Sequence, residues 1–500
     1  MLALTLLGTY LVDFCGADVR RRVDIPQLMV EEAKEGAHAR RVIAAYDRMF
    51  AGKPELAILR ALGYFNRPAD PAALRLVRSK IDYRQYQAAL KRLHTARLIL
   101  TRDPAQPLDC HPLVREYFSG DATPEGHAKL YGYYSKQAPY RPESLEEMRP
   151  LVFAVYHGCR AGRYEDAIEN VYRDRMLRGN EGYLLKKLDA FGTNLSLVAD
   201  FFETPWTQTV AAIAPSRQSW LFGIAGFALR AVGRLADAVE PMQAAINVSL
   251  DLEDWSSVAR CYVSLSELHL SVGNVPETVE AAQRAVDFNE RGRDEPLGLR
   301  LIPRTNLAFA LQQSGELSEA GRLFAEAELL HAESNRTHPI LYSISGYRYC
   351  DLLLIQGQTA EVRRRAYQTL RWAEELRLPL NIGLDHLSLG RAHIPDSAES
   401  THHLDQAVDF LRRAGQLDYL PLALLARGTP QDLAEVFRIA TRSGMRLHLT
   451  DYHLASARLA LLNGDRTQAR EHFTKAETLI QETGYHRRDS DLAELRPQCT

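Results

Sequence analysis

The residues of this 500-residue chain with the most obvious potential for chemistry are its histidines. His386, His393, His402 and His403 stand close together in sequence and could hold a metal ion. However, no cysteine lies near them, and their spacing follows none of the usual zinc-binding patterns. We therefore interpret them as surface or loop histidines and predict no metal site.

Catalytic signatures are also missing. Adjacent glutamates stand at 31–32, 146–147 and 374–375, but neighbouring positions on a helix point about 100° apart and cannot form a dyad. The sequence contains neither H-E-x-x-H nor G-x-S-x-G, and it lacks the G-x-x-x-x-G-K-[ST] loop that cradles nucleotide phosphates. We predict a protein that is not an enzyme and that carries no cofactor.

Recognition of a ligand is the remaining chemistry. Tyr342, Tyr347 and Tyr349 stand on one predicted helix, and Arg363 and Arg364 stand on the next. Tyrosine and arginine are frequent anchors of binding surfaces, so these five residues are our candidates for lining a ligand groove. The alternatives are that the tyrosines pack in the core and that the arginines form a solvated helix face.

A repeating helical unit must position these residues. Glycines at 233, 273, 315 and 357 lie 40 to 42 residues apart, and small or large apolar residues follow them at offsets of 5, 9 and 12. Each unit predicts a helical hairpin, in which the glycine ends the first helix and the small residues let the second helix approach closely. The predicted packing positions are Gly233, Ala238, Ala245, Gly273, Ala282, Gly315, Ala320, Phe324, Ala327, Gly464, Ala469, Phe473 and Ala476.

This pattern resembles the tetratricopeptide repeat, although the usual unit has about 34 residues and these units are longer. One hairpin cannot bury its apolar face alone, so neighbouring hairpins must stack into a superhelix. The concave surface of such a superhelix is free to bind a partner. We therefore predict an all-α protein whose main part is an α-solenoid of long tetratricopeptide-like hairpins over 216–500.

The segment before the solenoid has a different pattern. Residues 1–53 predict helices, beginning with an apolar one at Leu2–Phe14. Over 54–120 we expect three helices and then a short β-hairpin leading into a last helix, which is the winged-helix arrangement. Residues 121–215 predict a helical bridge, in which Gly162 starts a first repeat-like hairpin.

The order of these segments resembles the C-terminal portion of bacterial STAND ATPases of the NACHT/NB-ARC type. The residues that carry the resemblance are LALTLLGTYL near the start, HPLVREYF at the end of the winged helix, and the long repeats that follow. In that family the apolar helix follows a nucleotide-binding domain, so the resemblance implies such a domain in cis or in trans. Ligand capture by the repeat arm releases autoinhibition in the family.

His111 is the residue to which the resemblance assigns a nucleotide-sensing role. Cys110-His111-Pro112 stands where related animal and plant proteins carry Met-His-Asp, whose histidine contacts bound ADP. Proline replaces aspartate here, and no phosphate-binding loop is present. The alternative is that His111 caps or packs the last helix of the winged helix, and the sensing role requires a nucleotide domain that docks on it.

DNA binding is the second functional hypothesis. Residues 54–120 carry eleven Lys and Arg against six Asp and Glu, although the whole chain has a net charge of only −2. The six cysteines are scattered, which fits a reducing compartment. The apolar start lacks the basic region and cleavage site of a signal peptide, and no stretch is long and apolar enough for a membrane span. We expect a cytoplasmic protein.

These observations predict a non-catalytic sensor or scaffold in a signalling or defence regulator. Its repeat arm would bind a protein or peptide ligand, and its winged helix would relay the signal. The alternative is a DNA-binding transcriptional regulator whose winged helix carries a repeat effector arm.

Overall fold

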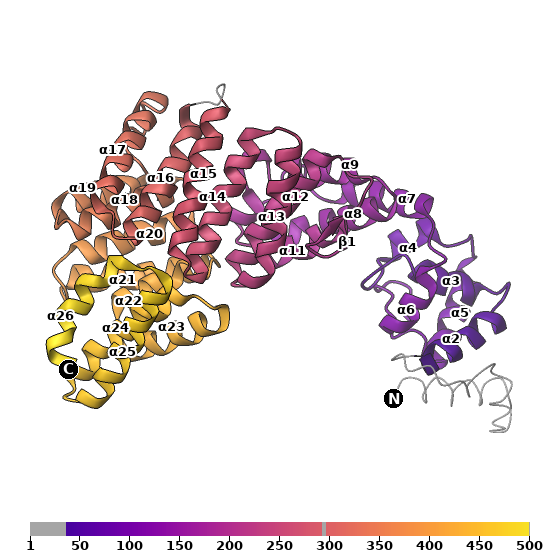
Figure 1. Ribbon diagram of the computed structural model, residues 1–500. Helices are drawn as coiled ribbons and strands as arrows, with labels where there is room; N and C mark the ends of the chain where they lie inside the picture. The colour runs from indigo at the N-terminus through magenta and orange to yellow at the C-terminus, as the bar shows by residue number, and fades with distance from the viewer. Residues whose placement is uncertain (1–36, 293–296, 500) are drawn as a thin grey trace. The chain divides into compact units, whose positions relative to one another are not determined.

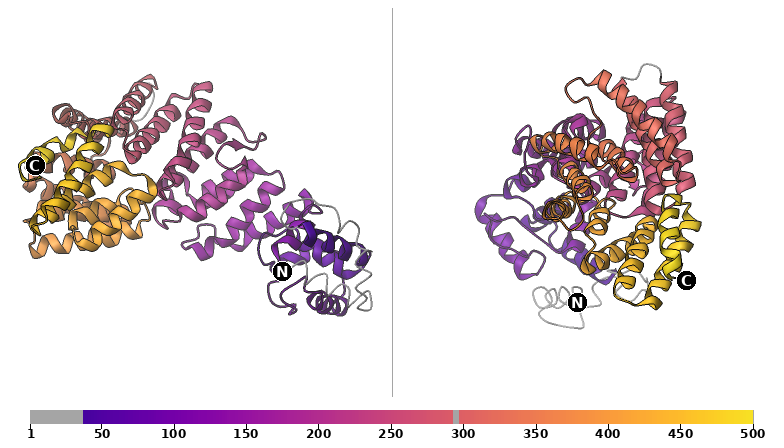
Figure 2. Two further views of the ribbon diagram at one scale, coloured as in Figure 1. Left: turned by 60° about the horizontal axis from the view of Figure 1, so that its bottom comes forward. Right: turned by 90° about the vertical axis from the view of Figure 1, so that its left-hand side faces the viewer.

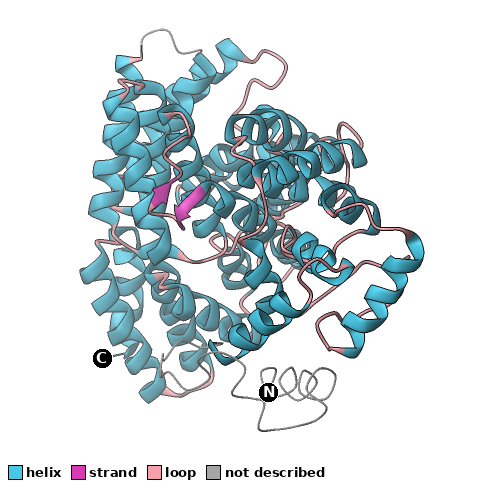
Figure 3. Ribbon diagram, turned by 90° about the vertical axis from the view of Figure 1, so that its right-hand side faces the viewer, coloured by secondary structure: helices cyan, strands magenta, loops and turns pink. Residues whose placement is uncertain are grey.

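About three quarters of the described residues of the computed structural model, 37–292 and 297–499, lie in helices (Figure 3). Within them, the only paired strands are β1 (Phe202–Thr204) and β2 (Gln208–Thr209), which are antiparallel. This confirms the prediction of an essentially all-α fold. The expected helix at Leu2–Phe14 lies outside the described residues. Contacts divide the chain into two compact units between Met176 and Leu177, a position inside the predicted bridge over 121–215.

The first unit begins with short helices whose starts are fixed by side chains and prolines. Asp70 accepts a hydrogen bond from the backbone N–H of Ala72 at the start of α4, and Asp82 does the same for Gln85 in α5. The helices of this part are α2 (Ala37–Met49), α3 (Pro54–Leu62), α4 (Pro71–Val77), α5 (Tyr83–Thr95) and α6 (Pro112–Ser119).

A β-hairpin is expected between α5 and α6, and the structure shows only part of one. The backbone N–H of Leu100 donates to the carbonyl of Asp109 at 2.8 Å, and Ala69 and Leu108 form an isolated antiparallel bridge. No regular strand forms in the described residues between α5 and α6. Proline at 104 and 107 removes backbone donors there, which shortens any ladder.

Close packing of α3 against α6 leads to a testable prediction. A Cβ added at Gly63 would lie 2.2 Å from the carbonyl oxygen of Phe118, so Gly63→Ala must push the two helices apart. We expect a loss of about 2–3 kcal/mol of unfolding free energy, measured by urea denaturation. Gly120→Ala is the matched control, because Gly120 also follows a helix with right-handed backbone angles and has open space around it. Equal effects of the two substitutions would contradict this account.

The rest of the first unit is a helix pair followed by a π-helical stretch. Helices α7 (Pro124–Gln137) and α8 (Leu145–Arg160) pack side by side, and α9 (Tyr164–Asp166) leads into the π-helical segment η2 (Ala167–Met176). Gly162 takes a left-handed φ of 71° before this stretch, as the predicted repeat-like hairpin requires.

The second unit is a series of helical hairpins (Figure 1). It opens with short elements: η3 (Gly179–Glu181), α10 (Tyr183–Lys186), α11 (Phe191–Val198) and η4 (Ala199–Phe201), followed by β1 and β2. The paired helices are α12 (Pro215–Ala231) with α13 (Leu235–Asp251), α14 (Trp255–Val272) with α15 (Val275–Arg291), α16 (Leu297–Gln313) with α17 (Leu317–Ser334), α18 (Ser343–Ile355) with α19 (Thr359–Glu375), α20 (Pro379–Ala392) with α21 (Ala398–Arg413), α22 (Leu420–Arg427) with α23 (Pro430–Ser443), and α24 (Arg446–Leu462) with α25 (Arg466–Thr483). The short helix η5 (His486–Arg488) and α26 (Asp489–Cys499) complete the unit.

The turn glycines and the small residues lie as the repeat pattern requires. Gly233, Gly273, Gly315, Gly357 and Gly464 all have a positive φ, between 74° and 92°, which a residue with a side chain rarely adopts. The apolar packing positions are at most 4% exposed: Ala238, Ala245, Ala282, Ala320, Phe324, Ala327, Ala469, Phe473 and Ala476.

The late hairpins fold back onto the turns of the early ones, which the sequence does not predict. Gly233 lies against Leu417 and Ser443, Gly273 against Arg446 and Thr483, and Gly315 against His486. We call the packing of residues 417–418, 443–446 and 483–488 on these turns the closure contact. Helix α24 packs against α14, and Figure 2 shows the orange-to-yellow late helices next to the red helices of the early hairpins. The expected open groove is therefore partly filled by the chain itself.

No helix in the described ranges is long and apolar enough to cross a membrane.

Candidate functional site: an arginine-lined pocket

A pocket of about 260 Å³ lies inside the second unit. Its walls come from the first helices of successive hairpins, α12, α14, α16, α18, α20, α22 and α24, and from the residues 485–488 at and beside η5. Early and late hairpins therefore line one cavity. Six arginines and four carboxylates are among the lining residues.

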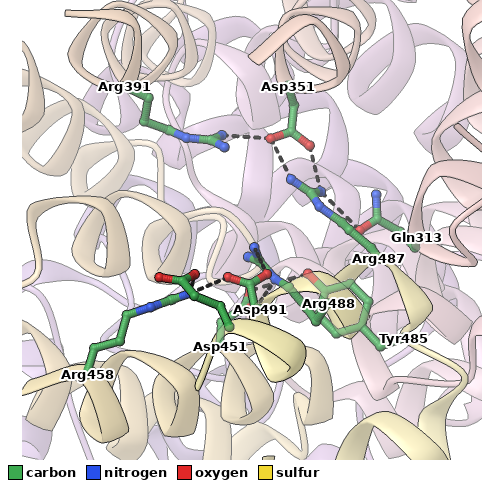
Figure 4. Close-up of polar contacts among 10 residues, drawn as sticks. Gln313, Asp351, Arg391, Asp451, Arg458, Tyr485, Arg487, Arg488 and Asp491 are labelled. Carbon is green, nitrogen blue, oxygen red and sulfur yellow. Dashed lines mark hydrogen bonds and ion pairs between the residues drawn. The ribbon is translucent and has the colours of Figure 1, made fainter. Parts of the chain in front are cut away.

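Asp351 of α18 is the central carboxylate (Figure 4). It pairs with Arg391 at 2.7 Å and with Arg487 at 2.6 Å, and the second Arg487 nitrogen donates at 2.9 Å. The amide of the buried Gln312 donates to it at 2.6 Å. Burial alone would raise the pKa of Asp351, but the charges of Arg487 and Arg391 outweigh it and hold the pKa below its ordinary value. Asp351 therefore stays ionised and ties η5 to α18 and α20.

A second network joins the first hairpin to the loop before α22. Arg230 of α12 pairs with Asp418 and, at 2.9 Å, with Glu267, which also pairs with Arg348 at 2.8 Å. The backbone N–H of Leu417 donates to the carbonyl of Ala231 at 2.9 Å beside these pairs. Burial raises the pKa of Asp418 although Arg230 lowers it. This network holds residues that are far apart in sequence on the two sides of the closure contact.

A third group surrounds Arg488. Its Nε donates to Asp451 at 2.7 Å, and the hydroxyl of Tyr485 donates to the same carboxylate at 3.4 Å. Arg458 of α24 pairs with Asp491 at 2.6 Å, and Arg488 approaches Asp491 at 3.4 Å. These contacts hold η5 against α24, as Figure 4 shows.

One of the five predicted groove residues, Tyr347, lines the pocket, with its hydroxyl near Asp351. The other four lie elsewhere. Tyr342 packs against Trp372, Tyr349 stacks on Phe324, Arg363 donates to the carbonyl of Ala392, and Arg364 pairs with Glu361 on its own helix.

His111 is the N-cap of α6. Its Nδ1 accepts a hydrogen bond from the backbone N–H of Leu113 at 3.2 Å, which is the capping role considered from the sequence.

The histidines examined for metal binding are not all at the surface. His386 and His403 are buried, and their Nδ1 atoms lie 2.9 Å apart, so the surface interpretation is wrong for these two. The same arrangement joins His127 to His157 and His453 to His472 across their hairpins. Among the described residues, no group of three or more His, Cys, Asp or Glu side chains could hold a metal ion.

The sequence interpretation missed most of the pocket, and one signal could have found part of it. The residue six positions before a turn glycine is Glu267, Phe309, Asp351 or Arg458 in four different repeats, and all four line the pocket. Charged residues at a position that faces inward are unusual and could have indicated a site. The polar stretch after Gly484 also brings Tyr485, Arg487 and Arg488 into the pocket.

The fold and the pocket define the second unit as a helical-repeat solenoid with a small, partly open pocket in its interior. No protein-family model matches the sequence, and no curated protein matches it. Among solved structures, the chain is similar to a STAND protein with a tetratricopeptide repeat sensor from Pyrococcus horikoshii. The two share 12% identity and a TM-score of 0.43, over 91% of this chain and 66% of that one, so the chain spans just under two thirds of its length.

The chain is also similar to a Rap protein complexed with Competence and Sporulation Factor, with 11% identity and a TM-score of 0.47, over 72% of this chain and 99% of that one. Both TM-scores are below 0.5. The assignment to a tetratricopeptide-like solenoid therefore rests on the hairpins, turn glycines and buried small residues of this chain.

Proposed function

We propose that the second unit is a non-catalytic sensor that binds a protein or peptide ligand in the arginine-lined pocket. The observation that carries the proposal is that one cavity is lined by α12, α14 and α16 on one side and by α22, α24 and η5 on the other. A ligand in this cavity touches both sides of the closure contact at once. Binding is therefore linked to whether the superhelix is closed.

The physical basis is a shift between two populations. A ligand changes the balance of two conformations only by the difference in its affinity for them. The intact pocket exists only while residues 417–418 and η5 stay on the early hairpins. A ligand that needs both walls favours the closed superhelix, and its release favours the open one.

The first unit would carry the output. The order α3, α4, α5 and α6, with Ala69 bridged to Leu108, supports a winged-helix domain over 54–120. In this proposal the domain relays the state of a nucleotide-binding domain present in cis or in trans, as in a STAND-type signalling or defence regulator. A P-loop domain encoded next to this chain would support the relay, and His111 would then be tested for nucleotide contact.

Thermal unfolding in the presence of a random peptide library tests the sensor proposal. We expect individual peptides to stabilise the second unit, by roughly 2.7 kcal/mol at a concentration 100-fold above the dissociation constant. Ala426→Phe fills the pocket and should abolish the shift, because Ala426 lines it and is half-buried. Ala434→Phe on the exposed face of α23 is the matched control. A shift that survives Ala426→Phe would place the ligand elsewhere and contradict the proposal.

DNA binding by the first unit remains the second candidate because of one observation on α5. This helix has no acidic residue between Tyr83 and Thr95, and it exposes Arg84, Lys91 and Arg92. Arg92 is paired with the buried Glu55, which reduces the charge available for phosphates. A gel-shift series against salt concentration tests it, since phosphate contacts give a steep salt dependence. Arg84→Gln with Lys91→Gln should abolish such a shift if it exists.

A further inference from the structure

We propose that the pocket binds the C-terminal carboxylate of a peptide that ends in an apolar residue. This inference rests on the proposed sensor function and specifies which chemical group the pocket recognises. It follows from the difference between the charged groups that line the pocket and those that remain accessible in it.

The accessible charge in the pocket is positive. The side chains of Arg391, Arg458 and Arg488 are 29%, 41% and 27% exposed. The lining carboxylates are much more covered, with the most exposed of them, Glu267, at 15% and Asp351 at 3%. The three most exposed of the charged side chains that line the pocket are therefore all guanidinium groups.

The hydrogen-bonding capacity of the lining side chains also favours an anionic ligand. Asp351 accepts from three side chains, and Glu267 accepts from two arginines, so these carboxylates are already satisfied. Within the described part of the chain, Arg391 donates through Nη1 alone, and Arg458 donates through Nη2 alone. A guanidinium has five N–H donors, so both arginines keep donors for an oxyanion. Asp418 keeps one carboxylate oxygen, Oδ1, without a hydrogen-bond partner among the described residues, but this oxygen is buried and its side chain is only 9% exposed, so the accessible groups with spare capacity are the arginine donors.

The remaining wall is apolar. Leu270, Phe309, Leu422, Leu425 and Leu454 come from α14, α16, α22 and α24. A volume of about 260 Å³ is slightly below the roughly 300–1,000 Å³ of sites for drug-sized ligands. One apolar residue with its terminal carboxylate matches this combination of size, apolar wall and arginines. A free carboxylic acid with an apolar body has the same chemistry and is separated from the peptide by experiment.

The test uses the full chain and four probes in a titration followed by thermal shift: N-acetyl-Ala-Ala-Leu, its C-terminal amide, 4-methylpentanoate and inorganic phosphate. We expect the peptide acid to bind at least about tenfold more tightly than the amide, because only the acid accepts charge-assisted hydrogen bonds from the arginines. Phosphate should not compete at equal concentration.

Each other outcome is decisive. Equal binding of acid and amide overturns the carboxylate inference and leaves the peptide sensor standing. Binding of 4-methylpentanoate without either peptide keeps the carboxylate inference and overturns the peptide ligand. Competition by phosphate at equal concentration would show that the ligand needs no apolar residue and would overturn that part of the inference. Binding by none of the probes overturns the whole inference.

Two variants localise the effect without leaving a buried acid unpaired, since the second partner of Arg458, Glu494, is 66% exposed. Arg391→Gln leaves Asp351 paired with Arg487, and Arg458→Gln leaves Asp491 close to Arg488. Each should weaken binding of the peptide acid about tenfold and change binding of the amide little. Arg391→Lys should restore part of the affinity, since it keeps the charge. Arg470→Gln, on the exposed face of α25 and outside the pocket, is the control and should have no effect.

Discussion

Asp351→Asn is expected to destabilise the second unit by about 3–5 kcal/mol, because it removes the negative charge that two arginines share. Arg487, whose side chain is only 9% exposed, would be left without a carboxylate partner inside the protein. Asparagine has the same shape as aspartate, so the effect reports the charge and not a cavity. Urea unfolding followed by tryptophan fluorescence measures it, since Trp206, Trp220, Trp255 and Trp372 all lie in the second unit.

The control for Asp351→Asn is Asp409→Asn. Asp409 pairs with Arg413 on the surface of α21, where both side chains are more than 60% exposed. Exposed ion pairs contribute roughly 0–1 kcal/mol, so this variant should unfold almost as the parent does. Similar losses in the two variants would show that Asp351 does not hold the closure contact. A larger loss at Asp351 should be accompanied by faster hydrogen exchange in η5 and α26.

Mild acid is expected to destabilise the first unit through His127 and His157. Both side chains are buried, and burial lowers the pKa of His127 to about 4 and of His157 to about 3. In the unfolded chain the two histidines take up protons with an ordinary pKa near 6.5, whereas in the folded unit they stay neutral to lower pH. The stability that they contribute is therefore fully present above pH 6.5 and is lost as the pH falls toward 4. Lowering the pH from 7.5 to 5.5 should therefore reduce the free energy of unfolding of this unit by roughly 2–3 kcal/mol through the histidine pair.

Hydrogen exchange of peptides from α7 and α8, corrected for the intrinsic pH dependence, measures this loss. His127→Gln with His157→Gln removes the titration and should leave protection nearly independent of pH over this range, even if the variant is less stable throughout. His338→Gln is the control, because His338 lies in the second unit. A pH profile that is unchanged in the double variant would assign the acid sensitivity to other groups.

The repeat architecture was predictable because it is local. Turn glycines and the alanines that follow them act within one hairpin, so their spacing indicates each hairpin without knowledge of the rest. The closure contact depends on pairs such as Arg230 with Asp418, which no periodicity connects. The pocket exists only because of such pairs, and its arginines look like ordinary surface residues in the sequence.

Other misses have equally specific causes. The β-hairpin expected before α6 forms only in part, because prolines at 104 and 107 limit its backbone pairing. The absence of a nearby cysteine and of a zinc-binding spacing says nothing about burial, and His386 and His403 in fact satisfy each other inside a hairpin. Their burial depends on the register of α20 against α21.

The fold-back of the late hairpins changes how the second unit should melt and refold. Open repeat arrays behave as one-dimensional chains, in which end repeats fray and loss of one leaves distant repeats intact. Here Arg230 meets a residue 188 positions away, so early and late hairpins share one cooperative transition. Deleting residues 485–499 should therefore loosen α12 and α14 as well as α24. Refolding should be slow for an all-helical protein, since such distant partners must find each other before the array becomes stable.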